Sequence, residues 1–145
     1  MLAFVAALLS GIGMAIQGAL NAALAKIVGL LQTTFLVHVV GTVLAGILLF
    51  VPEISKGNLS ALGKAPWYLW LGGLLSVPIV YGVATSIKAV GAAPATTLIV
   101  VAQVLTACIV DHFGLFGLKV TQFFWWKWVG ICFLALGSWL LLKGR

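Results

Sequence analysis

The stretch GMAIQGALNAALAKIVG, residues 13–29, closes an apolar run that starts near residue 2 and carries no ionised side chain before Lys26. A helix needs about 20 mainly apolar residues to cross the hydrocarbon core of a bilayer, and this run is long enough. It nevertheless contains two side-chain amides, Gln17 and Asn21. An amide costs free energy in hydrocarbon unless it is hydrogen-bonded. The segment therefore predicts a membrane helix in which the two amides have a specific structural or functional role.

The composition of the whole chain predicts the same environment. Of its 145 residues, 63% are hydrophobic and 7% are charged, whereas a soluble domain carries about 25% charged residues. Apolar runs long enough to span a membrane occur at about residues 2–24, 31–51, 67–87, 92–111 and 123–142. These spans take up most of the chain, so we expect an all-α integral membrane protein with a single five-helix transmembrane domain, residues 1–145.

Aromatic residues support two of the span boundaries. Three of them open the third span and three open the fifth: Trp67, Tyr68, Trp70, Trp125, Trp126 and Trp128. Since Trp and Tyr are enriched where lipid meets water, both groups are expected on the same side of the membrane. The longest connection with ordinary loop composition is residues 52–66.

The basic residues divide evenly between the two faces of the membrane, because five spans put the chain termini on opposite sides. Four lie on each face: Lys26, Lys88, Lys143 and Arg145 against Lys56, Lys64, Lys119 and Lys127. An imbalance of Lys and Arg normally sets orientation, and this chain has none. Either other features orient the protein, or it inserts both ways and forms an antiparallel homodimer. Such a dimer would contain the inverted repeat of many transporters, whose substrate site lies at the repeat interface.

Polar and small side chains recur along one face of the first span. Ser10, Met14, Gln17 and Asn21 follow one another at spacings of four, three and four residues, so they share a helix face. Hydrogen bonds between membrane helices contribute about 0.6 to 2 kcal/mol each, and small residues let the helices approach. The face is therefore either a helix–helix contact or part of a substrate site.

Other spans carry polar groups at comparable depth, which makes them candidates for the same substrate site: His38, Tyr81, Thr96 and Gln103. His38 is either a hydrogen-bonded packing residue or a proton carrier. Tyr81 is either a substrate contact or an interface aromatic, and Pro78 should kink the third span. Gln103 is the strongest candidate, since an unpaired amide near mid-membrane would be costly.

Asp111 and His112 stand where the fourth span ends. Adjacent residues on a helix do not face each other, so we do not expect a catalytic pair. Asp111 either closes the helix, bonded to the backbone or to a basic neighbour such as Lys119, or carries protons. The two acids, two His and two Cys of the chain are scattered, so no cluster predicts a metal, a cofactor or an enzyme active site. The basic residues form no stripe, so we expect no nucleic-acid partner.

Four segments together carry a resemblance to a known family: GMAIQGALNAALAKIVG (13–29), HVVGT (38–42), PWYLWLGGLLSVPIVYG (66–82) and VGAAPATTLIVVAQVLTACIVDHFGLFG (90–117). Over essentially its whole length the chain resembles the YdcZ-like family of the drug/metabolite transporter superfamily. The resemblance implies a multi-pass exporter of the bacterial inner membrane, with a tendency to dual topology. It also implies a fold like one half of a ten-helix carrier.

The chain departs from the four-span small multidrug resistance exporters, which it resembles in plan. Those proteins place a carboxylate in the first span that holds protons and cationic substrate in turn, whereas this chain offers Gln17 and Asn21. An amide cannot be charged, which leaves three options: a neutral or zwitterionic substrate, facilitated diffusion, or a proton path through Asp111 or His38. His38 also stands where the resemblance implies a small residue.

We therefore predict a transporter that exports a small molecule by alternating access, with its site at the interface of an antiparallel homodimer in the lipid bilayer. Two alternatives stay open. One is a non-transporting membrane subunit of a larger complex, and the other is a small membrane-embedded enzyme.

Overall fold

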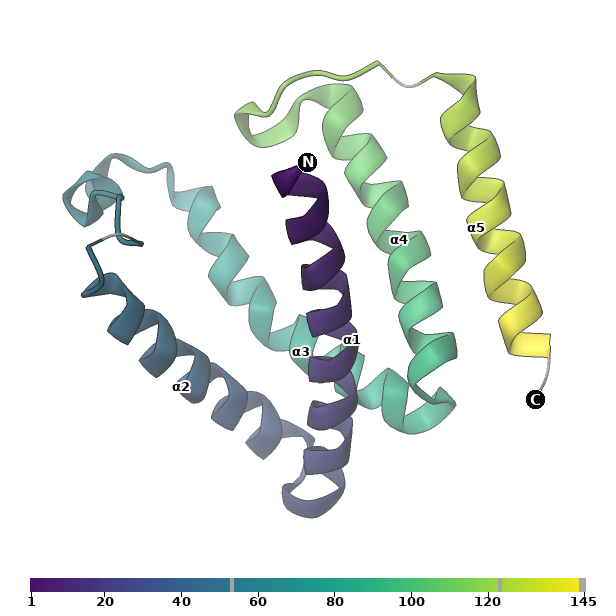
Figure 1. Cartoon of the computed structure of the whole chain (residues 1–145), viewed down its shortest axis with the longest axis horizontal. Coiled ribbons are helices and arrows are strands. Elements are labelled where there is room, and N and C mark those ends of the chain that lie inside the picture. Colours follow the sequence, from purple (N-terminus) through teal and green to yellow (C-terminus); the bar gives the residue numbers. More distant parts are fainter. Residues whose placement is uncertain (53, 123, 144–145) are drawn as a thin grey trace. The chain divides into compact units, whose positions relative to one another are not determined.

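The computed structural model describes residues 1–52, 54–122 and 124–143. Five long helices follow one another along the chain (Figure 1): α1 (Leu2–Val28), α2 (Leu30–Leu49), α3 (Leu71–Val90), α4 (Ala92–Phe113) and α5 (Trp125–Lys143). Three short 3₁₀ helices lie in the connections: η1 (Leu59–Lys64), η2 (Trp67–Trp70) and η3 (Leu115–Gly117). Each long helix is long and apolar enough to cross a membrane, the third as Trp67–Val90. The predicted all-helical architecture with five spans is confirmed for the described residues.

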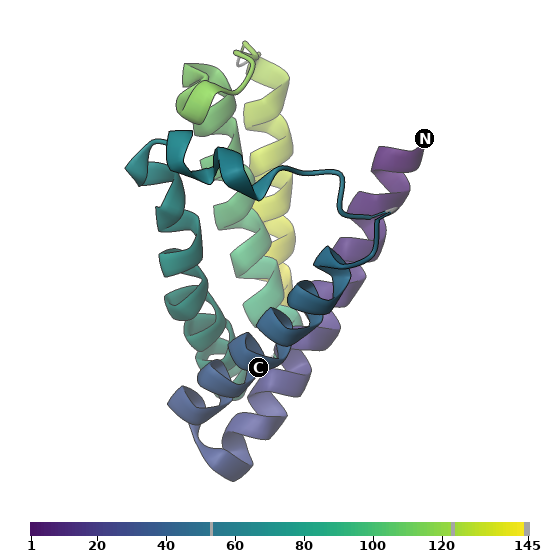
Figure 2. The same cartoon turned by 90° about the vertical axis from the view of Figure 1, so that its left-hand side faces the viewer.

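The helices form two compact units, Met1–Thr85 and Ser86–Arg145. In the first unit α1 packs against α2, and Figure 2 shows the two helices meeting at the turn that joins them. Buried residues of small or moderate size lie in both helices near this turn: Asn21, Ala22, Ala25, Thr33 and Thr34. Small side chains let membrane helices approach closely, so the α1–α2 contact is held mainly by packing at this end.

A single residue, Gly29, joins α1 to α2. Its φ of 96° and ψ of 157° are backbone angles that essentially only glycine adopts. Its N–H donates to the Ala25 carbonyl at 3.2 Å, and its carbonyl accepts from the Thr33 N–H at 3.0 Å. Backbone hydrogen bonding thus continues through the turn, so α1 runs to Val28 and α2 begins at Leu30. The helix α1 therefore extends past the end of the apolar run expected near residue 24, and α2 begins one residue before the run expected from residue 31.

The same turn recurs between α3 and α4. Gly91 has φ 87° and ψ 166°; its N–H donates to the Ile87 carbonyl at 2.8 Å, and its carbonyl accepts from the Ala95 N–H at 3.2 Å. The local sequence recurs as well, because KIVG at 26–29 corresponds to KAVG at 88–91 and a Thr-Thr pair follows each glycine. The chain therefore contains a short internal repeat of one helix–glycine–helix turn.

In the second unit α4 and α5 run side by side (Figures 1 and 2). α4 ends at Phe113, after which Gly114 takes a left-handed conformation (φ 60°, ψ 35°) and donates its N–H to the Val110 carbonyl. Helices commonly end in this way because glycine has no Cβ to clash. The connection then folds back, and the Thr121 N–H donates to the Asp111 carbonyl at 2.8 Å.

Large apolar side chains cover the outside of every long helix. Leu8, Val40, Leu74, Ile109 and Phe133, one from each helix, are all more than half exposed. A water-soluble monomer rarely shows contiguous apolar patches on this scale. Hydrocarbon solvates such a surface, so the exposed apolar side chains are suited to the interior of a membrane.

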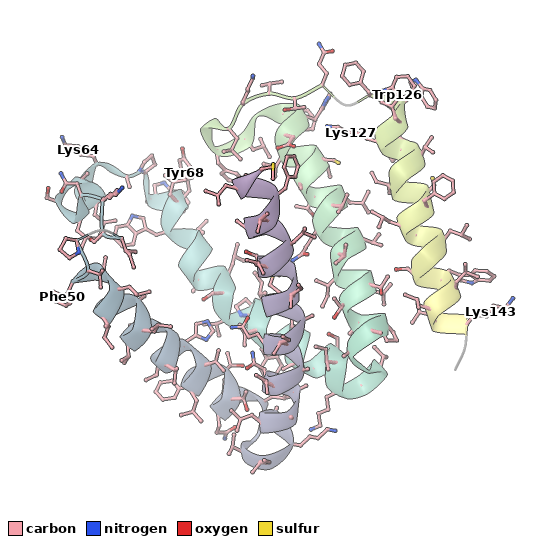
Figure 3. All side chains as sticks on the ribbon, in the orientation of Figure 1. Phe50, Lys64, Tyr68, Trp126, Lys127 and Lys143 are labelled. Atoms are coloured by element: carbon pink, nitrogen blue, oxygen red, sulfur yellow. The ribbon has the colours of Figure 1, made fainter. Side chains whose placement is uncertain are left out.

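Charged and aromatic side chains lie at the helix ends. Figure 3 shows Trp126 and Lys127 where α5 begins and Lys143 in its last turn. Lys64 in η1 and Tyr68 in η2 precede α3. If the helices span the membrane, the Trp and Tyr rings at these helix ends lie where lipid meets water.

Candidate functional site

The two amides of α1 lie one helical turn apart but in different surroundings. Asn21 is only 6% exposed and belongs to the group of buried residues near Gly29. Gln17 and Ser10, which precede it on the same face, are exposed. The predicted polar face therefore starts at a packed position and opens outward toward the N-terminus of α1.

Neither amide of α1 is hydrogen-bonded by the described part of the chain. The side-chain bonds found in α1 and α2 belong to Thr33, Thr34 and His38, and none involves Gln17 or Asn21. Hydrocarbon offers no partner either, and an unpaired amide there costs about 1 to 3 kcal/mol by protein mutational data.

His38 links α2 to α3. Its Nδ1 lies 2.7 Å from the Thr34 carbonyl oxygen, and its Nε2 lies 2.9 Å from the Ser76 Oγ. The Ser76 hydroxyl in turn donates to the Gly73 carbonyl at 2.6 Å. His38 and Ser76 are both partly exposed. His38 thus makes a defined interhelical contact with Ser76, a partner that spacing alone cannot identify. Its roles in substrate binding and proton transfer stay predictions.

Pro78 lies inside α3, two residues after Ser76. A proline has no N–H, so the Leu74 carbonyl loses its usual helical donor and α3 is weakened at this point. Tyr81, one turn further on, is 41% exposed. Its backbone carbonyl accepts from the Thr85 hydroxyl at 2.7 Å, and the role of its phenol in substrate binding stays a prediction.

The polar residues of α4 belong to the second unit. Gln103 is exposed and Thr96 is partly exposed. Thr106, on the same helix face, donates its hydroxyl to the Ala102 carbonyl at 2.9 Å and is thereby satisfied within its own helix. Gln103 forms no such bond among the described residues, so it shares the unpaired state of Gln17.

Asp111 is partly exposed and lies two residues before the end of α4. The hydrogen bond that ties it to the following connection is made by its backbone carbonyl. Lys119, the basic neighbour considered as its partner, is exposed. Both interpretations of the Asp111 carboxyl, a helix-end group or a proton carrier, stay predictions.

A cleft of about 340 Å³ lies between α4 and α5 in the second unit. Its lining is apolar and aromatic apart from one imidazole and one thiol: Leu105, Cys108, Ile109, His112, Phe113, Trp128 and Ile131. The His112 ring packs edge to face on the Phe113 ring, with 4.9 Å between the centroids. His112 was not predicted to line a cavity. The helical spacing of 105, 108, 109 and 112 is the signal that indicates a shared face.

The candidate residues fall into two groups that the structure describes separately. Gln17, Asn21 and His38 belong to the first unit, and Gln103 and Asp111 belong to the second. A shared polar cavity is therefore a prediction. Among the described residues, no three His, Cys, Asp or Glu side chains come together in a group that could hold a metal ion.

Comparison with known proteins identifies one family. A family model described as "Putative inner membrane exporter, YdcZ" matches residues 2–140. No curated protein and no solved structure matches the chain.

Proposed function

This chain belongs to the YdcZ family of inner membrane proteins, and we propose that it exports a small molecule by alternating access as an antiparallel homodimer. Its five apolar helices and the family's description both support a membrane transporter. Transport rather than catalysis is the activity that the family suggests. The proposed dimer, its interface and the substrate site go beyond what the family and the apolar helices support.

The observation that carries the proposal is the set of unpaired amides on membrane helices. Gln17 and Gln103 are exposed on α1 and α4 and form no hydrogen bond within the described residues. Amides in these positions lower the stability of an isolated chain in lipid. A polar cavity between two copies removes that cost and gives each amide a ligand or water to bind.

The charge distribution supports an antiparallel pairing of the two copies. Lys26, Lys88 and Lys143 lie in the last turns of α1, α3 and α5, which end on the same face if every helix spans. Four basic residues on each face leave no bias for orientation. A pair of oppositely inserted copies also provides the inverted repeat on which alternating access commonly depends.

A ligand screen on purified protein tests the proposed site. Compounds are ranked by how far they raise the unfolding temperature of the full-length dimer, and the hits are tested again on Gln103→Ala. Removing one hydrogen-bonding group from a site built around it should cost most of the affinity. We expect hits that stabilise the wild type, fail to stabilise Gln103→Ala, and cross vesicle membranes only when the wild type is present.

Thr106→Val is the matched control for this screen, because its hydroxyl is already bonded within α4. The control should bind and transport like the wild type. Compounds that stabilise all three proteins equally, and whose flux does not depend on the protein, would contradict the proposal.

A further inference from the structure

We propose that the cleft between α4 and α5 is a lipid site, which holds one acyl chain of an anionic phospholipid with the lipid phosphate beside Lys119 and Lys127. Such a site goes beyond the export function and does not depend on it, because every residue involved belongs to the second unit. Three features support it: the length of the cleft, its position at the end of α4, and the charges found there.

The cleft has the length and the lining of a site for one hydrocarbon chain. Along α4 its lining runs from Leu105 to Phe113, which is about 12 Å at a rise of about 1.5 Å per residue. One leaflet of a bilayer has a hydrocarbon thickness of roughly 15 Å, half of the whole core. The cleft volume is about 340 Å³, and the lining is apolar apart from Cys108 and His112. If α4 spans the membrane, a chain in the cleft therefore has apolar surroundings over most of one leaflet.

One end of the cleft lies where lipid meets water. Phe113 is the last residue of α4, and Trp128 lies in the first turn of α5. Two more tryptophans, Trp125 and Trp126, open α5, with their ring centroids 4.1 Å apart. Tryptophan is enriched at the level of the lipid headgroups. The phosphate of a lipid whose chain fills the cleft is thus expected beside the residues that follow α4 and begin α5.

The fold of the connection after α4 keeps Lys119 close to this end of the cleft. Both neighbours of Lys119 lie against Gly114: a Cβ there would be 3.1 Å from the Leu118 carbonyl oxygen and closer still to the Val120 side chain. The Thr121 N–H is also bonded to the backbone of α4. The Lys119 side chain itself is exposed. Its ammonium group is therefore available to a headgroup at the end of α4.

Lys127 lies at the same end of the cleft, on α5. It precedes Ile131, a lining residue, by four positions, so the two side chains share a face of the helix. Lys127 is partly exposed, whereas Trp126 and Trp128 on either side of it are exposed, and Figure 3 shows it near the start of α5. Lys127 thus stands between the apolar cleft and the water. A phosphate oxygen is a strong acceptor for a lysine ammonium group in such a position.

The charges at this end of the cleft favour an anionic headgroup over a zwitterionic one. Lys119 and Lys127 are positive, Asp111 near the end of α4 is negative, and His112 is counted as neutral. One net positive charge remains, which complements the single negative charge of phosphatidylglycerol. Each basic residue near a membrane surface strengthens the binding of anionic lipid roughly fivefold. We therefore expect a roughly fivefold preference for phosphatidylglycerol over phosphatidylcholine, whose headgroup has no net charge.

Photo-crosslinking of the full-length wild-type protein tests the site. The protein is placed in phosphatidylcholine nanodiscs that contain a trace of either lipid with a diazirine in one acyl chain, and labelled residues are mapped by mass spectrometry. We expect labels on the cleft-lining residues of α4 and α5, about fivefold more with phosphatidylglycerol than with phosphatidylcholine. The helix α2 contains no charged residue, so both lipids should label it equally.

Two lysine variants test the headgroup site. Lys119→Gln and Lys127→Gln each remove the one net positive charge, so each should lower the ratio of the two labels at the cleft from about five to about one. Lys64→Gln is the matched control. Lys64 is also exposed, but it lies in η1 of the first unit. Its replacement should leave the ratio at the cleft unchanged.

The two cysteines provide a matched pair that tests the acyl-chain site. Cys108→Phe places a ring in the cleft, so label at the lining residues should be lost although both lysines remain. Cys132 is exposed on α5 and does not line this cleft. Cys132→Phe should therefore keep the wild-type labels and their fivefold ratio.

Three results would overturn the proposal. Equal labelling of the cleft by both lipids would mean that ordinary boundary lipid covers it. A cleft without label, in a protein whose α2 is labelled, would mean that another helix covers it. A Cys108→Phe variant with the wild-type pattern would place the bound chain elsewhere.

Discussion

Replacing Gln17 by leucine distinguishes an amide kept for a ligand from one that holds the fold together. Gln17 is exposed on α1, and the described residues give its side chain no hydrogen bond. Removing an unpaired amide from hydrocarbon should raise the free energy of unfolding by about 1 to 3 kcal/mol in an isolated chain. This value is the upper bound for the dimer, in which the cavity already offers the amide water. For a chain of this size, each kcal/mol corresponds to roughly 4 °C in the unfolding temperature. Gln17→Leu should therefore be more stable than the wild type while losing ligand binding.

Thr106→Val provides the internal standard for this prediction. The Thr106 hydroxyl is bonded to the Ala102 carbonyl at 2.9 Å, so its removal releases no unpaired group. The change should stay within about 0.5 kcal/mol. The assay is thermal unfolding of the full-length proteins in lipid nanodiscs, followed by the fluorescence of the six tryptophans, with chemical cross-linking to count subunits. If Gln17→Leu lowers the unfolding temperature, dissociates the dimer and still transports, the amide is structural and the reasoning is wrong.

Three further predictions concern the turn, the orientation and the acid of α4. Gly29→Ala should destabilise the protein by about 1 to 3 kcal/mol because of the positive φ at this residue. Gly13→Ala has open space at its Cβ and should stabilise the protein by up to about 1 kcal/mol. Unfolding by urea or heat measures the stability of both variants against the wild type. Adding two lysines within residues 27–31 should fix that link in the cytoplasm and reduce export. Co-expression of an oppositely biased copy should restore export. Full export by the biased copy alone would contradict dual insertion. Asp111→Asn removes a negative charge from the C-terminal end of α4, where the helix dipole disfavours it. The free energy of unfolding should therefore stay level or rise by about 0.3 to 1 kcal/mol, with export intact. If export lost its pH dependence, Asp111 would be the residue that carries the proton.

Sequence reasoning predicted the architecture because span formation depends on composition and length, which are local properties. The turns between the helices depend on backbone conformation, which composition does not determine. Gly29 and Gly91 each join two helices through one residue in a conformation reserved for glycine, so the helices extend further than the apolar runs indicate. The repeat of KIVG and KAVG at residues 26–29 and 88–91 is visible in the sequence. The structure shows that this sequence repeat forms the same helix–glycine–helix turn twice, because Gly29 and Gly91 have similar backbone angles.

The candidate site was predictable only as a set of residue types. Which amide is packed and which is open depends on helix rotation, and α1 is apolar enough all round that its pattern does not determine that rotation. The structure distinguishes Asn21 from Gln17 in this respect. The contact between His38 and Ser76 joins residues 38 positions apart in the chain. Such a pair depends on how α2 meets α3, which periodicity within one helix does not encode.

The orientation of the chain in the membrane tests the central claim most directly. Two C-terminal fusions report it, one to an enzyme active only in the cytoplasm and one to an enzyme active only in the periplasm, each normalised to the amount of fusion protein. Since the basic residues are balanced four against four, the antiparallel account predicts comparable activity from both fusions. Activity from one fusion alone would contradict it, because copies that all insert the same way cannot form an antiparallel pair.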